Sequence, residues 1–323
     1  MSLLTRDYDY PLPDELIARH PSERRDEARM MVLHRAEQRI EHSTFRDFPG
    51  YLRAGDLVVL NDTRVIPARA FSDSGNVELL FLEMLGAHTW KCLVKPGRRM
   101  RLGANVSVGG VSGTVTGIEP DGERIIAFQS AVDLDLVGEL PLPPYFDRRP
   151  DAADATRYQT VFAREAGAIA APTAGLHFTP ELLAQVPHAF LTLHVGVGTF
   201  RPVQVDDLSA HRMHSERYIV TKETAAAVNA ATRVIAVGTT SARVLETLGR
   251  PLHACSGSTD IFIHPPYQPR TVDVLLTNFH LPKSTLLMLI SALAGRDFIL
   301  RAYEEAIRER YRFFSYGDCM LIV

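Results

Sequence analysis

Two glycine-rich segments carry the side chains in this chain that are best suited to chemistry. They are Ala171-Pro-Thr-Ala-Gly-Leu-His-Phe-Thr179 and Leu193-His-Val-Gly-Val-Gly-Thr-Phe-Arg-Pro-Val203. Small residues let a ligand approach the backbone, while apolar flanking strands hold such a loop in place. Neither segment has the glycine pattern of a dinucleotide-binding fold or of a P-loop. We expect both to line a functional site, the alternative being two tight turns between buried strands. Their candidate residues are Thr173, Gly175, His177 and Arg201.

A third segment, Arg233 to Arg243, brings an apolar strand directly into Gly238-Thr239-Thr240-Ser241 and then a helix. Free amides and hydroxyls at a helix N-terminus bind anions such as a carboxylate or a phosphate. The position also lies beyond the carboxyl end of a strand, where α/β proteins usually bind ligands. An anion site is therefore the favoured interpretation, and a simple helix cap is the alternative.

The same pattern recurs further along the chain. The predicted strand Val272–Leu276 ends in Thr277-Asn278-Phe279-His280, so we expect Asn278 and His280 at the same edge of the sheet as the two threonines. Phe313-Phe-Ser-Tyr316-Gly-Asp318 precedes the predicted last strand. Two aromatic rings beside a carboxylate suit a cation or a stacked heterocycle, and equally suit a helix end that packs on a core.

His211-Arg-Met-His214-Ser-Glu216 allows two kinds of chemistry. A metal site would draw further ligands from His177 and His194, but the spacing is not that of HExxH. Proton transfer is favoured, because a histidine and a glutamate near neutral pKa form an acid/base pair.

The elements that position these residues divide the chain into three parts. Residues 1–70 and 146–323 have an α/β pattern, and residues 71–145 show short apolar runs separated by Gly, Asp, Ser and Pro. We predict an α/β domain with a mixed sheet, built from both ends of the chain, and an inserted small β-barrel domain over 71–145. The predicted helices are 13–18, 222–232, 241–248, 284–293 and one capped by Asp297; the predicted strands are 31–33, 56–60, 77–84, 89–94, 105–108, 113–117, 124–128, 234–237, 260–263, 272–276 and 319–323.

Composition is that of an ordinary globular protein of 323 residues, with a formal net charge of −3. The net charge provides no argument for nucleic-acid binding by the whole chain, although Lys95-Pro-Gly-Arg98-Arg99-Met-Arg101 and Arg148-Arg149 are locally basic. The longest apolar run, 286–293, is too short to cross a membrane. Three dispersed cysteines and the lack of a signal sequence predict a cytoplasmic protein.

Together these motifs resemble the S-adenosylmethionine:tRNA ribosyltransferase-isomerase family of queuosine biosynthesis. The resemblance includes the three glycine-rich segments above and covers most of the chain. It departs at Pro266 and Val274 and is weak over 72–86. The further matching stretches are Asp7–Pro13, Leu60-Asn-Asp-Thr-Arg-Val-Ile-Pro-Ala-Arg69, Gly138–Tyr145, Tyr158–Phe162, His211–Tyr218, Leu276–Pro282 and Phe313–Met320.

The resemblance implies an α/β domain with a β-barrel domain and an unusual use of S-adenosylmethionine. The family transfers and isomerises the ribosyl moiety of that donor onto 7-aminomethyl-7-deazaguanine at the wobble position of tRNA. Adenine and methionine leave, and the tRNA carries epoxyqueuosine. No metal is expected, and a monomer is the default expectation.

Roles follow as expectations from that chemistry. Proton transfer is assigned to His177, His214, Glu216 and His280. The donor carboxylate is assigned to Gly238, Thr239, Thr240 and Ser241, and the sulfonium to an aromatic face at Phe314 or Tyr316 with Asp318 nearby. Further substrate-binding candidates are Asn61, Arg64, Thr173, Gly175, Arg201 and Asn278. Lys95, Arg98, Arg99, Arg101, Arg148 and Arg149 are the candidates for gripping the RNA backbone.

Two rival functions remain open from the sequence. A metal-dependent hydrolase would use His177, His194, His211 and His214. A non-catalytic RNA-binding protein would use the barrel as a platform, but that segment has few aromatic residues on which bases stack.

Overall fold

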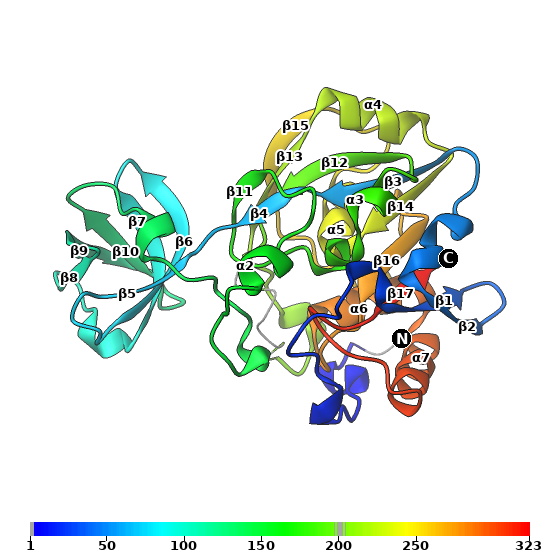
Figure 1. Cartoon of the computed structure of the whole chain (residues 1–323), viewed down its shortest axis with the longest axis horizontal. Coiled ribbons are helices and arrows are strands. Elements are labelled where there is room, and N and C mark those ends of the chain that lie inside the picture. The colour runs from blue at the N-terminus through cyan, green and yellow to red at the C-terminus, as the bar shows by residue number, and fades with distance from the viewer. Residues whose placement is uncertain (1–2, 197, 199–202, 204) are drawn as a thin grey trace.

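The computed structural model describes residues 3–196, 198, 203 and 205–323, and its strands form two large sheets (Figure 1). The larger sheet contains β1 (Arg29–His34), β2 (Arg39–Thr44), β3 (Asp56–Asn61), β12 (His188–Leu193), β13 (Glu216–Val220), β14 (Arg233–Val237), β15 (Cys255–Thr259), β16 (Val274–Asn278) and β17 (Cys319–Ile322). The smaller sheet contains β5 (Arg69–Phe71), β6 (Glu78–Gly86), β7 (Thr89–Lys95), β8 (Asn105–Val108), β9 (Val111–Ile118) and β10 (Arg124–Phe128). Between them, β4 (Thr63–Val65) pairs in parallel with β11 (Glu165–Ala168). The helices are α1 (Leu134–Val137), α2 (Asp154–Arg157), α3 (Pro180–Leu183), α4 (Lys222–Ala230), α5 (Gly238–Leu248), α6 (Thr285–Ala294) and α7 (Arg296–Arg308).

The larger sheet is mixed, as expected, and its centre is parallel. Its order is β15-β13-β12-β3-β14-β16-β17-β1-β2, and β12, β3, β14 and β16 run in one direction. Their carboxyl ends therefore meet at one edge. β17 runs antiparallel to β16 and pairs Cys319 with Asn278, so the residues just before β17 reach that edge too.

Alternating side chains of the central strands fill two cores, one on each face of the sheet. Leu57 and Val59 of β3 join a core that includes residues of α4 to α7. Val58 and Leu60 point the other way and pack with Phe45 and other aromatic residues from irregular segments. The long helices thus cover one face, and loops with short helical turns cover the other.

The smaller sheet is antiparallel and curled, with the order β5-β6-β7-β10-β9-β8. β5 and β8 are its edges; the Asp73 backbone N–H donates to the Ser107 carbonyl at 2.8 Å and links them. Register shifts within β6–β7 and β9–β10 mark bulges, which bend a sheet. The structure shows a curled sheet whose two edge strands are not paired as a ladder among the described residues. The expected small β-barrel is therefore not confirmed. Figure 1 shows this sheet at one end of the long axis of the molecule.

Most predicted elements are present, and the differences have local causes. The helix over 13–18 is wrong, since only a 3-10 turn forms at Asp14–Leu16. The strand over 260–263 is wrong as well: the strand is β15, and the Thr259 hydroxyl accepts the Ile261 N–H at 3.2 Å and turns the chain. α7 begins after Gly295, so Asp297 is a first-turn residue rather than the cap. None of the described helices is long and apolar enough to cross a membrane.

Candidate functional site

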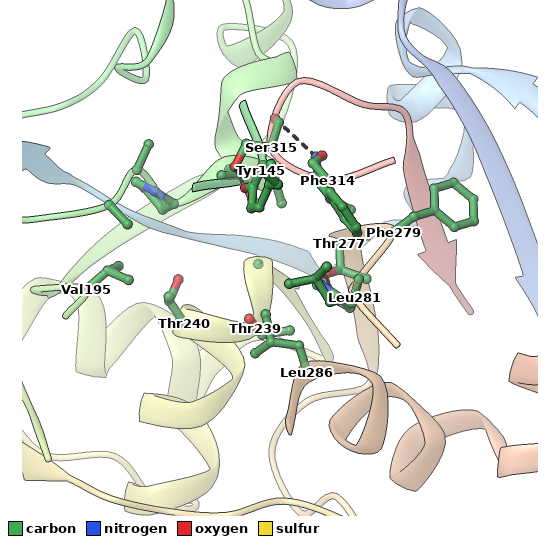
Figure 2. A pocket seen from close by; sticks show the side chains of 18 residues that line it. Tyr145, Val195, Thr239, Thr240, Thr277, Phe279, Leu281, Leu286, Phe314 and Ser315 are labelled. Carbon is green, nitrogen blue, oxygen red and sulfur yellow. Dashed lines mark hydrogen bonds between the residues drawn. The ribbon is translucent and has the colours of Figure 1, made fainter. Parts of the chain in front are cut away.

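A cavity of about 70 Å³ lies at the carboxyl edge of the parallel strands (Figure 2). Its wall comes from five parts of the chain that are far apart in sequence: 170–174, 195, 238–240, 277–281 and 314–315, with Tyr145 and Leu286 completing it. We call it the first cavity. The segments 238–241 and 277–280, predicted from sequence to share one edge, thus do so, because they lie at the carboxyl ends of the neighbouring parallel strands β14 and β16.

The first turn of α5 forms one wall of the first cavity. α5 starts at Gly238, three residues earlier than predicted, so both threonines are already helical. Gly238 has φ +82°, a conformation that side-chain-bearing residues rarely adopt. Thr240 is 7% exposed, and its hydroxyl has no hydrogen-bond partner among the described residues. Free amides and an unused hydroxyl at a helix N-terminus can bind an anion. The Ser241 hydroxyl is also unpartnered, but Ser241 is fully buried beneath this wall.

Asn278 and His280 belong to a second wall of the first cavity. The His280 ring nitrogen Nε2 lies 2.9 Å from the Thr277 hydroxyl. The backbone N–H of His280 donates to the Tyr303 hydroxyl at 2.8 Å. Burial lowers the pKa of His280 to about 3, so its ring is neutral at pH 7. The Asn278 amide donates to the Phe314 carbonyl at 2.8 Å, which ties β16 to the segment before β17.

His177 lies behind this wall, outside the first cavity. Its Nε2 is 3.3 Å from the Asn278 side-chain oxygen, and its ring packs on Phe45. Burial lowers the pKa of His177 to about 4, against an opposing contribution from that hydrogen bond. His177 therefore reaches the first cavity only through Asn278.

The aromatic face of the first cavity is made by Tyr145 and Phe314, whose ring centroids are 4.8 Å apart. Tyr316 points elsewhere, and its hydroxyl donates to Asp154 at 2.8 Å. Asp318 is buried and accepts the backbone N–H groups of Arg29 and Arg312 at 2.9 and 2.8 Å. The structure thus brings Phe314 to the cavity, but not the Tyr316–Asp318 pair.

A second cavity, of about 490 Å³, lies between the two sheets. Strands of the smaller sheet contribute Glu83, Lys91 and Glu123, and the larger part contributes His194, His214 and Glu216 among others. Val195 lines both cavities, so the two adjoin at the start of the second glycine-rich segment. His214 is solvent-exposed on this wall.

Glu216 is held rigidly. Its Oε2 accepts from Nη1 of Arg243 at 2.5 Å, and its Oε1 accepts the Gly196 N–H at 2.8 Å. Both side chains of the ion pair are almost fully buried, and Nε and Nη2 of Arg243 lack partners among the described residues. A carboxylate fixed in this way is a stationary acceptor rather than a free base.

Three other predicted substrate-binding residues, Asn61, Arg64 and Gly175, lie outside both cavities. The Asn61 side-chain amide donates to the Leu193 carbonyl, and its oxygen accepts the backbone N–H groups of Leu193 and Thr63. Arg64 is exposed on β4. Gly175 allows close packing, since a Cβ there would meet Phe162 and Thr160 at 2.9 Å. Arg201 lies outside the described residues. Thr173 lines the first cavity.

The predicted RNA-binding residues divide into two groups. Lys95, Arg98, Arg99 and Arg101 are exposed on the smaller sheet around a 3-10 turn. Arg148, in contrast, forms a fork with Asp154 at 2.6 and 2.8 Å and is largely buried, while Arg149 is exposed. Its bond with Asp154 leaves Arg148 poorly placed to contact a phosphate.

The histidines of the metal hypothesis are dispersed. His194 and His214 line the second cavity, His177 lies behind the first, and His211 packs on Phe262. Within the described part of the chain, no three His, Cys, Asp or Glu side chains are grouped as a metal site would require.

Sequence reasoning missed Tyr145, Ser315 and Arg243. Tyr145 donates to or accepts from the Ser315 hydroxyl at 2.5 Å, and both residues line the first cavity. Tyr145 and Ser315 each lie within a stretch that carried the family resemblance, which was the available signal. Arg243 ends the strand–helix segment with the glycine and threonines, but nothing local reveals its partner.

Comparisons with known proteins identify the family. A family model described as queuosine biosynthesis protein matches residues 5–322. Proteins named S-adenosylmethionine:tRNA ribosyltransferase-isomerase from Symbiobacterium thermophilum and Thermotoga petrophila are 51% and 48% identical, each match covering 98% of this chain and 99% of the relative. A crystal structure of S-adenosylmethionine tRNA ribosyltransferase from Thermotoga maritima is 42% identical with a TM-score of 0.57, over 98% of this chain and 100% of that one. The chain therefore belongs to the queuosine biosynthesis protein family, that of the S-adenosylmethionine:tRNA ribosyltransferase-isomerases, and is an enzyme of that family.

Proposed function

We propose that this enzyme transfers and isomerises the ribosyl moiety of S-adenosylmethionine onto 7-aminomethyl-7-deazaguanine at the wobble position of tRNA. The products are epoxyqueuosine in tRNA, adenine and methionine. The observation that carries the proposal is the pair of adjoining cavities, because a group transfer needs a donor site and an acceptor site that share a boundary. Val195 marks that boundary.

The first cavity suits part of the donor. The α5 N-terminus with the unused Thr240 hydroxyl would bind the methionine carboxylate, and its position in the wall of this cavity supports that assignment. The rings of Tyr145 and Phe314 offer faces to the sulfonium. The donor is larger than the first cavity, so its remaining part would extend past Val195 toward the second.

The second cavity suits the acceptor base. Its volume is seven times that of the first, and it carries the carboxylates of Glu83, Glu123 and Glu216. An aminomethyl-deazaguanine presents an amine and N–H donors, which carboxylates accept. A wobble base lies in a single-stranded loop, so it can leave the stack without breaking a duplex.

Proton transfer in the donor site falls to His280, because of the four candidates it alone lines the first cavity. Its neutral ring is in the base form, and the positive sulfonium acidifies the adjacent carbon. His214 is placed in the second cavity to accept a proton from the amine, which must be neutral to attack. His177 positions Asn278.

The smaller sheet is proposed as an RNA-binding unit. It has its own core around Phe81, Trp90 and Phe128, which supports treating 71–145 as an inserted domain. The exposed residues Lys95, Arg98, Arg99 and Arg101 would contact the tRNA backbone. Cytoplasm is the compartment proposed, and all three cysteines are free.

The test is direct. The protein is incubated with S-adenosylmethionine and tRNA bearing the aminomethyl base, and small products and digested nucleosides are analysed by mass spectrometry. We expect adenine, methionine and an epoxycyclopentyl nucleoside in equal amounts, and none with tRNA that carries ordinary guanine. Intact donor and unchanged tRNA, from protein shown to be folded by circular dichroism, would contradict the proposal.

A further inference from the structure

Two arginines that have no acidic partner in the described part of the chain meet beside the first cavity. Arg25 opens a 3-10 turn near the N-terminus, and Arg157 ends α2. Both line a small hollow of about 20 Å³ together with Ser22, His177 and Ser315 among others. Neither arginine was a candidate from sequence, because they are separated by 132 positions and belong to different segments.

The two guanidinium groups are fixed by backbone carbonyls. Arg25 donates to Leu176 at 3.0 Å and to Thr156 at 2.9 Å. Arg157 donates to Glu23 at 3.0 Å and to Ser22 at 2.7 Å. These acceptors are neutral, so they orient both side chains without cancelling either charge. Little side-chain freedom remains to be lost when a ligand binds.

The positive charge at this hollow is uncompensated. Among the described residues, no carboxylate oxygen lies within 4 Å of either arginine, whereas Arg148, Arg164 and Arg233 each pair with a buried aspartate. Nε of Arg157 is buried without a partner. Burial lowers the pKa of Arg25, and the charge of Arg157 lowers it further. Two like charges held together in this way favour a bound anion.

We propose that Arg25 and Arg157 bind a phosphodiester group of the tRNA substrate, a role that rests on the function proposed above. Guanidinium groups match phosphate oxygens in geometry as well as charge. Ser315 lines both this hollow and the first cavity. A phosphate here would therefore lie beside the donor site and fix the position of the tRNA relative to the donor, as backbone contacts fix register in nucleic-acid complexes.

The experiment measures affinity of the full-length protein for fluorescently labelled tRNA by anisotropy over a range of salt concentrations. The variants are Arg25→Gln, Arg157→Gln and the double variant, with Arg301→Gln as a matched control because Arg301 is exposed on α7. Each lost phosphate contact should weaken binding about five- to tenfold and reduce the salt slope by about 1. Arg301→Gln should change neither.

Two further measurements separate the alternatives. Arg25→Lys and Arg157→Lys replace the Gln variants if those do not fold. They keep the charge but lose the forked guanidinium, so a smaller loss of tRNA affinity is expected. Calorimetry with S-adenosylmethionine alone distinguishes RNA phosphate from the donor carboxylate as the anion. Unchanged donor affinity is expected, and a selective loss of donor binding would overturn the proposal.

The proposed function and this site fail differently. Wild-type protein that modifies tRNA, with variants that bind it equally well and with the same salt slope, would refute the arginine site alone. Wild-type protein that neither binds nor modifies tRNA would refute the proposed function and this site with it.

Discussion

Replacing Thr240 by valine should affect stability and donor binding in opposite directions. The Thr240 side chain is buried, and its hydroxyl has no partner among the described residues. A buried hydroxyl without a hydrogen bond carries a desolvation cost of about 1–3 kcal/mol. Valine has nearly the same shape and no such cost, so the free energy of unfolding should stay constant or rise by up to about 1 kcal/mol.

Donor binding should weaken in the same variant. A hydrogen bond from a neutral donor to a charged group contributes about 1.5–3 kcal/mol, which corresponds to a rise in Kd for S-adenosylmethionine of about 10- to 100-fold. Urea denaturation measures the first quantity, and isothermal titration calorimetry measures the second.

Thr224→Val is the matched control. Thr224 is a buried residue of α4 that lines neither cavity. Unlike that of Thr240, its hydroxyl has a partner, since it donates to the Phe190 carbonyl at 2.6 Å. This variant should lose about 1–3 kcal/mol of stability and keep its donor affinity. The reasoning would be refuted if Thr240→Val were as destabilised as the control and bound the donor normally.

Three further predictions use other parts of the site. Burial lowers the pKa of His280 to about 3, so on acidification the histidine is protonated in the unfolded state before it is protonated in the folded state. As pH falls below about 6.5, His280 should therefore lower the free energy of unfolding by about 1.4 kcal/mol per pH unit. In urea titrations at pH 5 and 7, His280→Gln should lose correspondingly less stability than the wild-type protein. Arg243→Met should destabilise the protein by about 3–5 kcal/mol by leaving the Glu216 carboxylate buried and unpaired, and adding Glu216→Gln should recover most of that loss in a double-mutant cycle. Gly138→Ala places a Cβ 1.9 Å from the Pro67 carbonyl oxygen and should lower thermal stability strongly, whereas Gly50→Ala meets nothing within 4 Å; equal melting temperatures for the two variants would contradict the packing argument.

Local signals predicted the elements well. Thr221 caps α4, accepting a backbone N–H with its hydroxyl, as its position before the predicted helix 222–232 indicated. Ser284 was predicted to be the first residue of a helix, and in the structure it caps α6 in the same way. Five of the six strands in the smaller sheet also match the predicted short apolar runs, and β5 was not predicted. β2 was missed because it is an edge strand without a buried residue, which leaves little apolar pattern. β13 was missed although its positions alternate between buried and exposed, because its first buried residue is the charged Glu216.

The candidate site was predicted unevenly for a related reason. Gly238, Thr240, Asn278 and His280 share an edge because each lies at or just beyond the carboxyl end of a strand of one sheet. The sequence did not reveal that Arg148 pairs with Asp154, since that pair is a tertiary outcome rather than a spacing. Whether a charged residue is free or paired depends on what packs beside it.

The sequence by itself determined the family, the α/β class and the segments that meet at the site, because motifs and hydrophobic periods are local. Only the tertiary structure decided that Glu216 is locked by Arg243, that Phe314 rather than Tyr316 faces the first cavity, and that Arg25 meets Arg157. These contacts join residues distant along the chain, and their partners are selected by packing and electrostatics that no single segment encodes.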